Sequence, residues 1–340
     1  MAGREQRTVV QSGYVLAIGH GASGTKRVFN VLERSRRTHC RWGPHSLPGT
    51  PFNQLPDAVA FGPEDARLMD SHWDEAVEWA RRHVSAQDVI PPPPKEHLRP
   101  LGRYVAGMLG NMRVRQVGGK AFSIFRRREW EIPGWLGSAE ALRQAKLMLR
   151  MGKVPAWTAW ALRNRPDATV VHIVRHPAAY LHAWRGRWAG SRDLDQVASA
   201  NRQRLMNVAR IHPRWAERIG DVTHIPALEA ELWFWRYATE TIHDAGTESG
   251  RYELVKDEAM VIDPIGTSRR LYFACGLPWE EGLERYLAHK AEHWKRHTVR
   301  HSELLDEEME KAIARVMAGS PMERWWDGLE VVSLFTYVFR

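Results

Sequence analysis

The chain has 340 residues, of which 44% are hydrophobic and 26% charged. This is the composition of a globular protein that can bury a sizeable core, and it excludes a disordered or fibrous chain. The 49 Lys and Arg against 40 Asp and Glu give a formal net charge of +9, which favours anionic ligands. The basic residues are spread along the chain and form no tail, so we expect no nucleic-acid partner.

The two cysteines, Cys40 and Cys275, have no metal-ligand spacing, so neither a disulfide framework nor a structural zinc site is indicated. No apolar run reaches the roughly 18 residues that span a bilayer, and the start lacks a signal-peptide pattern. We therefore expect a cytoplasmic protein without a transmembrane segment. We expect residues 1–12 to be a flexible segment and residues 13–340 to form one domain.

The first predicted element is a short buried strand in residues 13–21, because its apolar run is continuous and stops at Gly19. A glycine-rich turn follows, and then a helix with Val28, Phe29 and Leu32 on one face. Strand, turn and helix in this order begin an α/β unit. Such a turn can hold phosphate, because glycines let backbone N–H groups approach an anion and the helix start adds partial positive charge.

The next 130 or so residues are less regular. Residues 48–63 are rich in Pro and Gly and predict irregular structure, and a helix is expected around 70–84. The four prolines at 91–94 exclude a helix or an inner strand. The stretch 101–150 is left open, although 139–153 fits a helix or a helix running into a strand.

The second half contains clearer elements. Thr169–Val174 predicts a second buried strand, which Pro177 ends. Three helices and a third strand follow: a helix in 178–188, the strand in 251–260, a helix in 268–276 closed by Gly276, and a helix in 305–319 that ends at Gly319.

Two known kinds of phosphate loop fit the first turn poorly. Gly19, Gly21 and Gly24 match the glycine spacing of dinucleotide-binding folds, but no ribose-binding acid follows about 20 residues later. A nucleoside triphosphatase needs Lys and then Ser or Thr directly after the last glycine. Here Lys26 comes one place late, and Arg27 stands where the magnesium ligand belongs.

A third kind fits better. Residues 21–32, GASGTKRVFNVL, resemble the phosphosulfate loop of the sulfotransferase family, in which a basic residue precedes Ser-Gly-Thr. Ser23, Gly24 and Thr25 match that loop, and Ala22 stands in the place of the basic residue. Three further segments resemble the family in the right order, so that the resemblance spans residues 14 to 280. They are matched by Pro166, Asp167, Ala168, Arg175 and Pro177, by Gly152–Pro155, and by Glu258, Asp263, Pro264, Phe273, Gly276, Leu277 and Pro278.

The resemblance implies an α/β fold: a three-layer sandwich with a central parallel sheet, the P-loop NTPase-like sulfotransferase fold with helical insertions. It implies a sulfotransferase that uses 3′-phosphoadenosine 5′-phosphosulfate and no metal. The first loop, made by His20, Gly21, Ala22, Ser23, Gly24, Thr25, Lys26 and Arg27, is then expected to bind the 5′-phosphosulfate, and Arg175 the 3′-phosphate.

The resemblance also suggests catalytic residues. Lys26 is expected to neutralise the charge that grows on the bridging oxygen, with Lys26 or His20 replacing the basic residue missing at Ala22. Lys153 is expected near the transferring group. Of His39 and His45, we expect His45 to be the base for the acceptor hydroxyl, since Gly43 and Pro44 place it in a loop.

A second departure is Ala183, where the family commonly has a serine that binds the 3′-phosphate. Ser191, Arg185, Arg187 or the basic segment 294–301 are candidates to replace it. Ala22 and Ala183 together keep an alternative open: a non-catalytic sulfotransferase-like protein that binds a polyanion or a partner.

The 16 Trp residues bear on the acceptor. Flat indole faces suit sugar rings or apolar acceptors, although most of these residues are expected in the core. We expect a hydroxyl-bearing carbohydrate or glycolipid acceptor first and a small hydrophobic alcohol second. The residues considered are Trp73, Trp79, Trp130, Trp135, Trp157, Trp160, Trp184 and Trp188.

Overall fold

The computed structural model describes residues 13–84, 95–103, 130–131, 137–188, 193–329 and 331–333. Its centre is a five-stranded parallel sheet in the order β2-β5-β1-β6-β7. These strands are β1 (Tyr14–Gly19), β2 (Thr38–Trp42), β5 (Lys146–Met151), β6 (Ala168–Val174) and β7 (Tyr252–Lys256).

The strand order makes β1 the point where the chain changes direction across the sheet. From β1 the chain goes to the edge strand β2, returns to β5 beside β1, and then crosses to β6 and β7 on the other side. In open α/β sheets, ligands bind at the carboxyl ends of the strands at such a switch point. The β1–α1 turn therefore occupies the expected place for a ligand.

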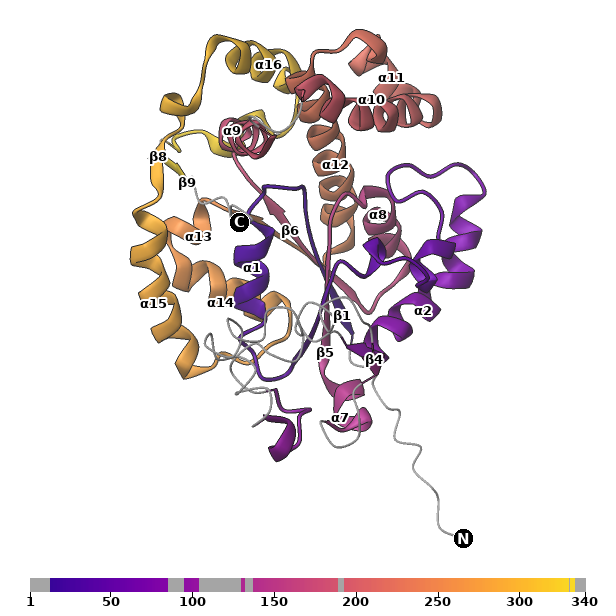
Figure 1. The fold of residues 1–340 in the computed structure, drawn as a ribbon, viewed down its shortest axis with the longest axis vertical. Coiled ribbons are helices and arrows are strands. Elements are labelled where there is room, and N and C mark those ends of the chain that lie inside the picture. Colours follow the sequence, from indigo (N-terminus) through magenta and orange to yellow (C-terminus); the bar gives the residue numbers. More distant parts are fainter. Residues whose placement is uncertain are drawn as a thin grey trace.

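Helices cover both faces of the sheet, and alternate residues of β1 point to opposite layers (Figure 1). Val15 and Ala17 pack with the layer of α1 (Thr25–Leu32), α13 (Ala259–Ile262), α14 (Pro264–Ala274) and α15 (Glu281–Lys295). Leu16 and Ile18 pack with the layer of α2 (Asp65–Arg82), α8 (Pro155–Asn164) and α12 (Ala227–Ser249). The three-layer α/β sandwich expected from the sequence is confirmed.

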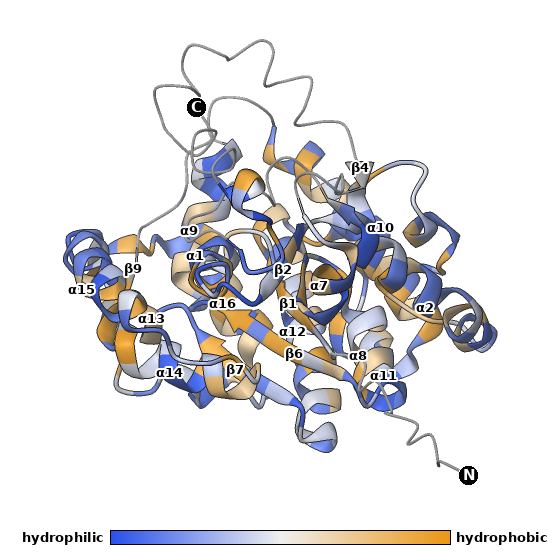
Figure 2. Ribbon diagram, turned by 90° about the horizontal axis from the view of Figure 1, so that it is seen from below, coloured by the Kyte–Doolittle hydropathy of each residue, from blue (hydrophilic) through white to orange (hydrophobic). Residues whose placement is uncertain are grey.

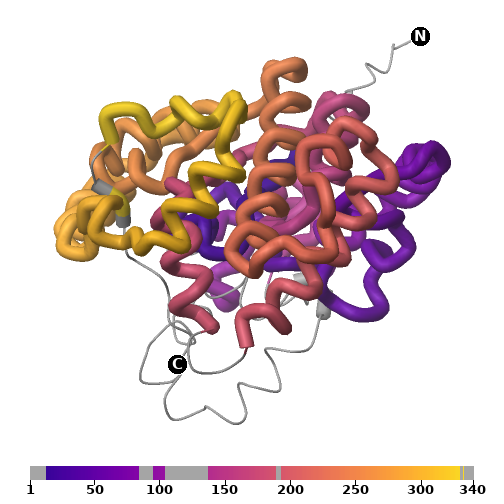
Figure 3. Tube along the Cα trace, turned by 90° about the horizontal axis from the view of Figure 1, so that it is seen from above, coloured from indigo at the N-terminus to yellow at the C-terminus, as the bar shows by residue number. Residues whose placement is uncertain are grey.

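A further group of helices lies beyond the carboxyl ends of the strands, where it packs on α12 (Figures 1 and 3). We call this group the helical cap. It consists of α9 (Pro177–Trp188), α10 (Leu194–Ile211), α11 (Pro213–Ile219) and α16 (Glu307–Met317). Figure 2 shows the apolar strands enclosed in the interior, with hydrophilic residues on α14 and α15 outside.

The remaining elements are short. They are the strands β3 (His83–Val84), β4 (Trp130–Glu131), β8 (Thr298–Arg300) and β9 (Val331–Ser333), the helix α7 (Ala139–Gln144), and the 3-10 turns Pro44–Ser46, Pro51–Gln54, Val222–His224, His301–Leu304 and Glu323–Trp326. None of the described helices is both long enough and apolar enough to cross a membrane.

The predicted strands in 13–21, 169–174 and 251–260 are confirmed as β1, β6 and β7, and the open stretch 139–153 is a helix followed by the strand β5. The helix expected around 70–84 is confirmed as α2, with different ends. It begins at Asp65, whose carboxylate accepts the Gly62 N–H, and it ends at Arg82 because His83 and Val84 pair with β4. The prolines at 91–94 lie outside the described residues.

Strand β2 was not predicted, because its sequence THCRW has no apolar alternation. Its polar side chains are nonetheless buried by neighbouring elements. The Arg41 guanidinium lies 5.2 Å from the Trp79 ring of α2, and a His39 ring nitrogen lies 3.3 Å from the carbonyl oxygen of Ala80.

Candidate active site

The turn between β1 and α1 is a compact loop of five residues. The N–H of Ser23 donates to the carbonyl of His20 at 3.0 Å, and Gly24 precedes the helix with φ 80°. A Cβ at Gly24 would lie 2.1 Å from Oδ1 of Asp257. Only glycine therefore fits here, for both its conformation and its close approach to Asp257.

Among the residues that the structure describes, Ala22 and Lys153 are the non-glycine residues with positive φ, at 70° and 60°. A left-handed conformation costs an L-residue about 1–2 kcal/mol. Both lie just beyond the ends of neighbouring strands, β1 and β5. Strained backbone of this kind is common at functional sites, so the carboxyl ends of β1 and β5 mark the candidate site.

Arg175 follows β6 and is 1% exposed. It donates to the carbonyl of Ala22 at 2.9 Å, and its Nε lies 3.7 Å from Oδ2 of Asp257. Burial lowers the pKa of Arg175, whereas Asp257 and Glu258 oppose that change. Arg175 thus holds the loop in shape, and contact with a 3′-phosphate stays a prediction.

Arg27 is also engaged in the interior. Its Nη1 lies 3.0 Å from Oδ1 of Asp257, a residue with no exposed surface, and its guanidinium lies 5.1 Å from the ring of Trp294. The position that carries the magnesium ligand in a nucleoside triphosphatase is therefore filled by a buried ion pair. Among the described residues, no group of three His, Cys, Asp or Glu is arranged to hold a metal ion.

Lys26 lies in the first turn of α1 and is half-buried. Burial lowers its pKa, the charge of Arg150 lowers it further, and Glu33 opposes both. Arg150 on β5 lies 4.6 Å from the ring of Trp42. Two cations thus lie on the β5 side of the loop.

His45 lies in the 3-10 turn that follows β2. Burial and, less strongly, the charge of Arg150 lower its pKa to about 4, and a backbone contact with Gly152 opposes them. The ring is therefore neutral at physiological pH and a weak base. His39, by contrast, lies within β2 and is 1% exposed.

A second group of three side chains surrounds the buried ring of Phe234, a residue of α12. Lys153 Nζ lies 6.0 Å and the Arg204 guanidinium 5.5 Å from its centroid, and the His20 ring meets it edge-on at 5.1 Å. Burial lowers the pKa of Lys153, which Glu231 of α12 raises and Arg204 lowers.

Glu231, Tyr180, Asn201 and Arg204 come from α12, α9 and α10, and sequence reasoning missed all four. Their hydrogen bonds lead to His20 in the loop. The one signal was a charged residue, Glu231, inside the otherwise apolar run of residues 230–235.

The structure also places the other residues that the sequence analysis singled out. Ala183 is buried in α9, Arg187 is exposed, and Arg185 pairs with Asp306. The late segment 294–301 reaches the site: Trp294 contacts Arg27, and the ring of His301 stacks on His176 with centroids 4.8 Å apart. Ser191 lies outside the described residues.

Few of the tryptophans considered for the acceptor are exposed enough to line a cleft. Trp73, Trp157, Trp160 and Trp184 are buried in the core. Trp79 and Trp188 are partly buried, and the side chains of Trp130 and Trp135 lie outside the description. The expectation that most of them belong to the core is confirmed for those four.

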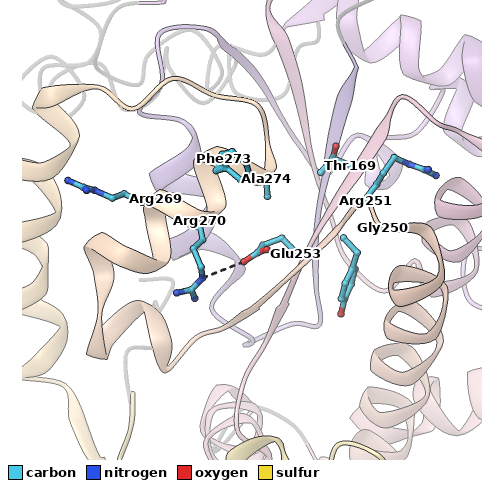
Figure 4. A pocket seen from close by; sticks show the side chains of 9 residues that line it. Thr169, Gly250, Arg251, Glu253, Arg269, Arg270, Phe273 and Ala274 are labelled. Atoms are coloured by element: carbon cyan, nitrogen blue, oxygen red, sulfur yellow. Dashed lines mark ion pairs between the residues drawn. The ribbon is translucent and has the colours of Figure 1, made fainter.

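A cavity of about 580 Å³ lies at the opposite end of the sheet, beside the starts of β6 and β7 (Figure 4). Its arginines have partners: Arg251 donates to the carbonyl oxygens of Ala168 and Leu162, Arg270 lies 3.9 Å from Glu253, and Arg269 donates to Glu284 at 3.2 Å. It therefore belongs to a different part of the molecule from the loop.

Fold and site together define the class: a three-layer α/β protein with a five-residue, glycine-containing turn at the switch point of its sheet. No protein-family model matches the sequence, and no curated protein matches it either.

The solved structures that this chain resembles include sulfotransferases. The sulfotransferase domain from the curacin biosynthetic pathway is 12% identical, with a TM-score of 0.40 over 80% of this chain and 76% of its own. STF9 from Mycobacterium avium is 13% identical, with a TM-score of 0.38 over 91% and 76%. The domain from the Synechococcus PCC 7002 olefin synthase is 17% identical, with a TM-score of 0.33 over 79% and 75%.

Proposed function

We propose that this chain is a sulfotransferase that moves a sulfuryl group from 3′-phosphoadenosine 5′-phosphosulfate to a hydroxyl acceptor. The observation that carries the proposal is the phosphate-type loop in which Arg27 is paired with Asp257 at 3.0 Å. A metal-dependent nucleotidase needs an oxygen ligand at that position. Sulfuryl transfer relies instead on alignment and on fixed positive charge.

The residues present suit an anionic donor. Backbone N–H groups of the loop and Lys26 in the first turn of α1 would hold the 5′-phosphosulfate. Around the loop, positively charged side chains outnumber carboxylates. Lys26 and Arg150 lie near Glu33, and Lys153 and Arg204 lie near Glu231. The donor, when bound, supplies the activated sulfuryl group, and Lys26 and Lys153 would stabilise the charge that develops on the departing oxygen.

For the acceptor we propose a carbohydrate or glycolipid hydroxyl. Of the tryptophans considered that the structure describes, the partly buried Trp79 and Trp188 are those that would still offer a ring face to it. The sequence resemblance suggests His45 as the base. It lies in the 3-10 turn after the edge strand β2, which β5 separates from β1. Its pKa of about 4 keeps the ring neutral and able to accept a proton at physiological pH.

A second candidate is a non-catalytic protein that binds a polyanion. It is favoured by Arg175, whose guanidinium is already engaged by Ala22 and Asp257, and by the absence of polar side chains at Ala22 and Ala183. In that case the loop would hold an anion without transferring a group from it.

Thermal melting with adenosine 3′,5′-bisphosphate, compared with ATP and magnesium, tests the proposal. At a hundredfold excess over Kd, the bisphosphate should stabilise the chain by about 2.7 kcal/mol, whereas ATP should not. Transfer of radiolabelled sulfuryl from the donor to octyl β-glucoside, which offers sugar hydroxyls on a lipid-like chain, then separates the enzyme from the binding protein. Stabilisation by ATP alone would reject the sulfotransferase proposal.

A further inference from the structure

A chain of hydrogen bonds joins the helical cap to the loop. Arg204 Nη1 donates to Asn201 Oδ1 at 2.5 Å, and Asn201 Nδ2 donates to Glu231 Oε2. The Tyr180 hydroxyl donates to Glu231 Oε1 and also meets Nδ1 of His20. Asn201, Glu231, Tyr180 and His20 are all buried, with exposed fractions of 2%, 2%, 0% and 6%.

The proton directions follow from chemistry, beginning at Arg204. A guanidinium only donates, so the Asn201 oxygen must face it and the Asn201 N–H groups must face Glu231. Two donors, from Asn201 and Tyr180, then converge on the Glu231 carboxylate, as an ionised carboxylate requires. The positive charges of Lys153, Arg204 and Arg187 favour that ionised form, although burial raises the pKa of Glu231.

The tautomer of His20 follows in turn. Tyr180 has one proton, and Glu231 accepts it, so the bond between Tyr180 and His20 must be donated by Nδ1–H of the imidazole. Nε2 is then left without a proton. It is buried, and among the described residues it has no hydrogen-bond partner.

A bare ring nitrogen is unsuited to the donor but suited to the acceptor. Its lone pair would repel a phosphate or sulfate oxygen held by the loop, whereas an O–H group would satisfy it. Burial, with Lys153 and Arg204, lowers the pKa of His20 well below its ordinary value, and a backbone hydrogen bond with Gly21 opposes them. The ring is therefore neutral before any reaction.

We propose that His20 binds the acceptor hydroxyl through Nε2 and is the general base of the transfer, with Tyr180 and Glu231 as positioning residues. This inference rests on the proposed function. Nε2 takes the hydroxyl proton, the acceptor oxygen forms the bond to sulfur, and the bond from sulfur to the bridging oxygen breaks, its electron pair leaving with adenosine 3′,5′-bisphosphate. The Glu231 carboxylate, acting through Tyr180, offsets the positive charge on the imidazolium. Half-buried Lys153, beyond the carboxyl end of β5, adds a positive charge that acts on His20.

The first test reads the tautomer directly and needs no substrate. NMR of the full chain with nitrogen-labelled histidine, assigned by comparison with His20→Gln, should show His20 neutral with its proton on Nδ1. In Tyr180→Phe that fixed tautomer should be lost. A proton on Nε2 in the wild type would mean that Glu231 is protonated and Tyr180 donates to His20, which overturns the proposal.

The second test uses turnover, with transfer of radiolabelled sulfuryl to octyl β-glucoside as the probe. His20→Gln should lower kcat by roughly 100-fold or more with unchanged affinity for the bisphosphate. Tyr180→Phe should lower kcat by roughly 10- to 100-fold with unchanged KM for the donor. The matched control is Tyr252→Phe, since the Tyr252 hydroxyl lies 2.8 Å from Nδ1 of buried His172 away from the loop. It should leave kcat unchanged.

The outcomes separate this inference from the function on which it rests. If the wild type does not bind adenosine 3′,5′-bisphosphate, the proposed function fails and the inference fails with it. If the wild type binds and transfers, but His20→Gln keeps its kcat while His45→Gln loses it, the function stands and His45 is the base.

Discussion

Arg175, beyond the end of β6, and Ala22, in the loop after β1, are joined by a hydrogen bond of 2.9 Å across 153 positions of the chain. Ala22 has the left-handed conformation, and its carbonyl group is what Arg175 holds. Asp257 at the end of β7 holds Arg175 in turn. Residues at three adjacent strand ends therefore fix the shape of the loop before any ligand arrives.

Replacing Arg175 should therefore cost stability first. Arg175→Ala leaves Asp257 buried with one cation fewer, and we expect a loss of about 3–5 kcal/mol. Arg175→Lys keeps the positive charge without the planar guanidinium group, so its loss of stability should be smaller. Urea unfolding measures both. Arg163→Ala, which removes an exposed pair with Glu248 at 3.6 Å, is the control and should change stability by at most ~1 kcal/mol. An unchanged midpoint for Arg175→Ala would show that the guanidinium serves a ligand alone.

The two loop glycines, Gly24 and Gly21, should differ sharply in how well they tolerate substitution by alanine. Gly24→Ala introduces a Cβ 2.1 Å from Asp257 Oδ1 at a φ of 80°, so we expect a loss of at least ~2 kcal/mol and weaker bisphosphate binding. Gly21→Ala meets nothing within 4 Å and should leave stability within ~1 kcal/mol. Thermal melting of the two variants checks this. Equal melting temperatures would contradict the close approach of Gly24 to Asp257.

Lys26 should act on the donor rather than on the fold. Lys26→Ala removes a charge-assisted contact worth about 1.5–3 kcal/mol, so the Kd for adenosine 3′,5′-bisphosphate should rise roughly 10- to 150-fold. Lys311→Ala removes the same charge from exposed α16, where Lys311 pairs with Glu307, and should leave the Kd unchanged. Calorimetry measures both. A Kd that Lys26→Ala does not alter would remove Lys26 from the donor site.

Glu258 should make stability fall as the pH rises. Burial and the charge of Asp257 raise its pKa from 4.5 to about 7, while its carboxyl group accepts the His176 N–H at 2.9 Å. Between these values the unfolded chain has released the proton and the folded chain still holds it, so the folded state loses relative stability with rising pH.

Glu258→Gln keeps a side-chain oxygen that can accept the His176 N–H, and the amide group does not titrate. Buried histidines with lowered pKa act in the opposite direction in the same range, His45 with a pKa of about 4 among them. The measurement is therefore the difference in unfolding free energy, wild type minus Glu258→Gln, from urea titrations at several pH values. It should fall between pH 4.5 and 7. A flat or rising difference would contradict the raised pKa.

Much of the sheet was predictable because its buried strands are locally encoded. The runs that became β1 and β6 are apolar, and turn residues follow them at Gly19 and Pro177. Strand β2 was not predictable, since its buried His39 and Arg41 are accommodated by Ala80 and Trp79, residues about 40 positions away. Local pattern does not show which distant groups will satisfy a polar side chain.

The residues of the candidate site also fall into two groups: those that the local sequence indicates and those that it does not. Residues 20–27 were recognisable because the conformations that a tight anion loop needs restrict which residues can form it, and Gly24 is the example. Glu231, Tyr180 and Asn201 carry no such local signal, because their significance comes from one another's position.

By itself, the amino-acid sequence predicted the α/β class and an anion-binding loop, and it determined the basic charge balance. Only the tertiary structure decided that Arg175 holds the loop, and that Glu231 and Tyr180 lie beside His20 with its Nε2 left without a partner among the described residues. The reason is physical: backbone conformation is set within a few residues, whereas the ionisation and tautomer of a buried group depend on charges and hydrogen-bond partners that folding brings from distant parts of the chain.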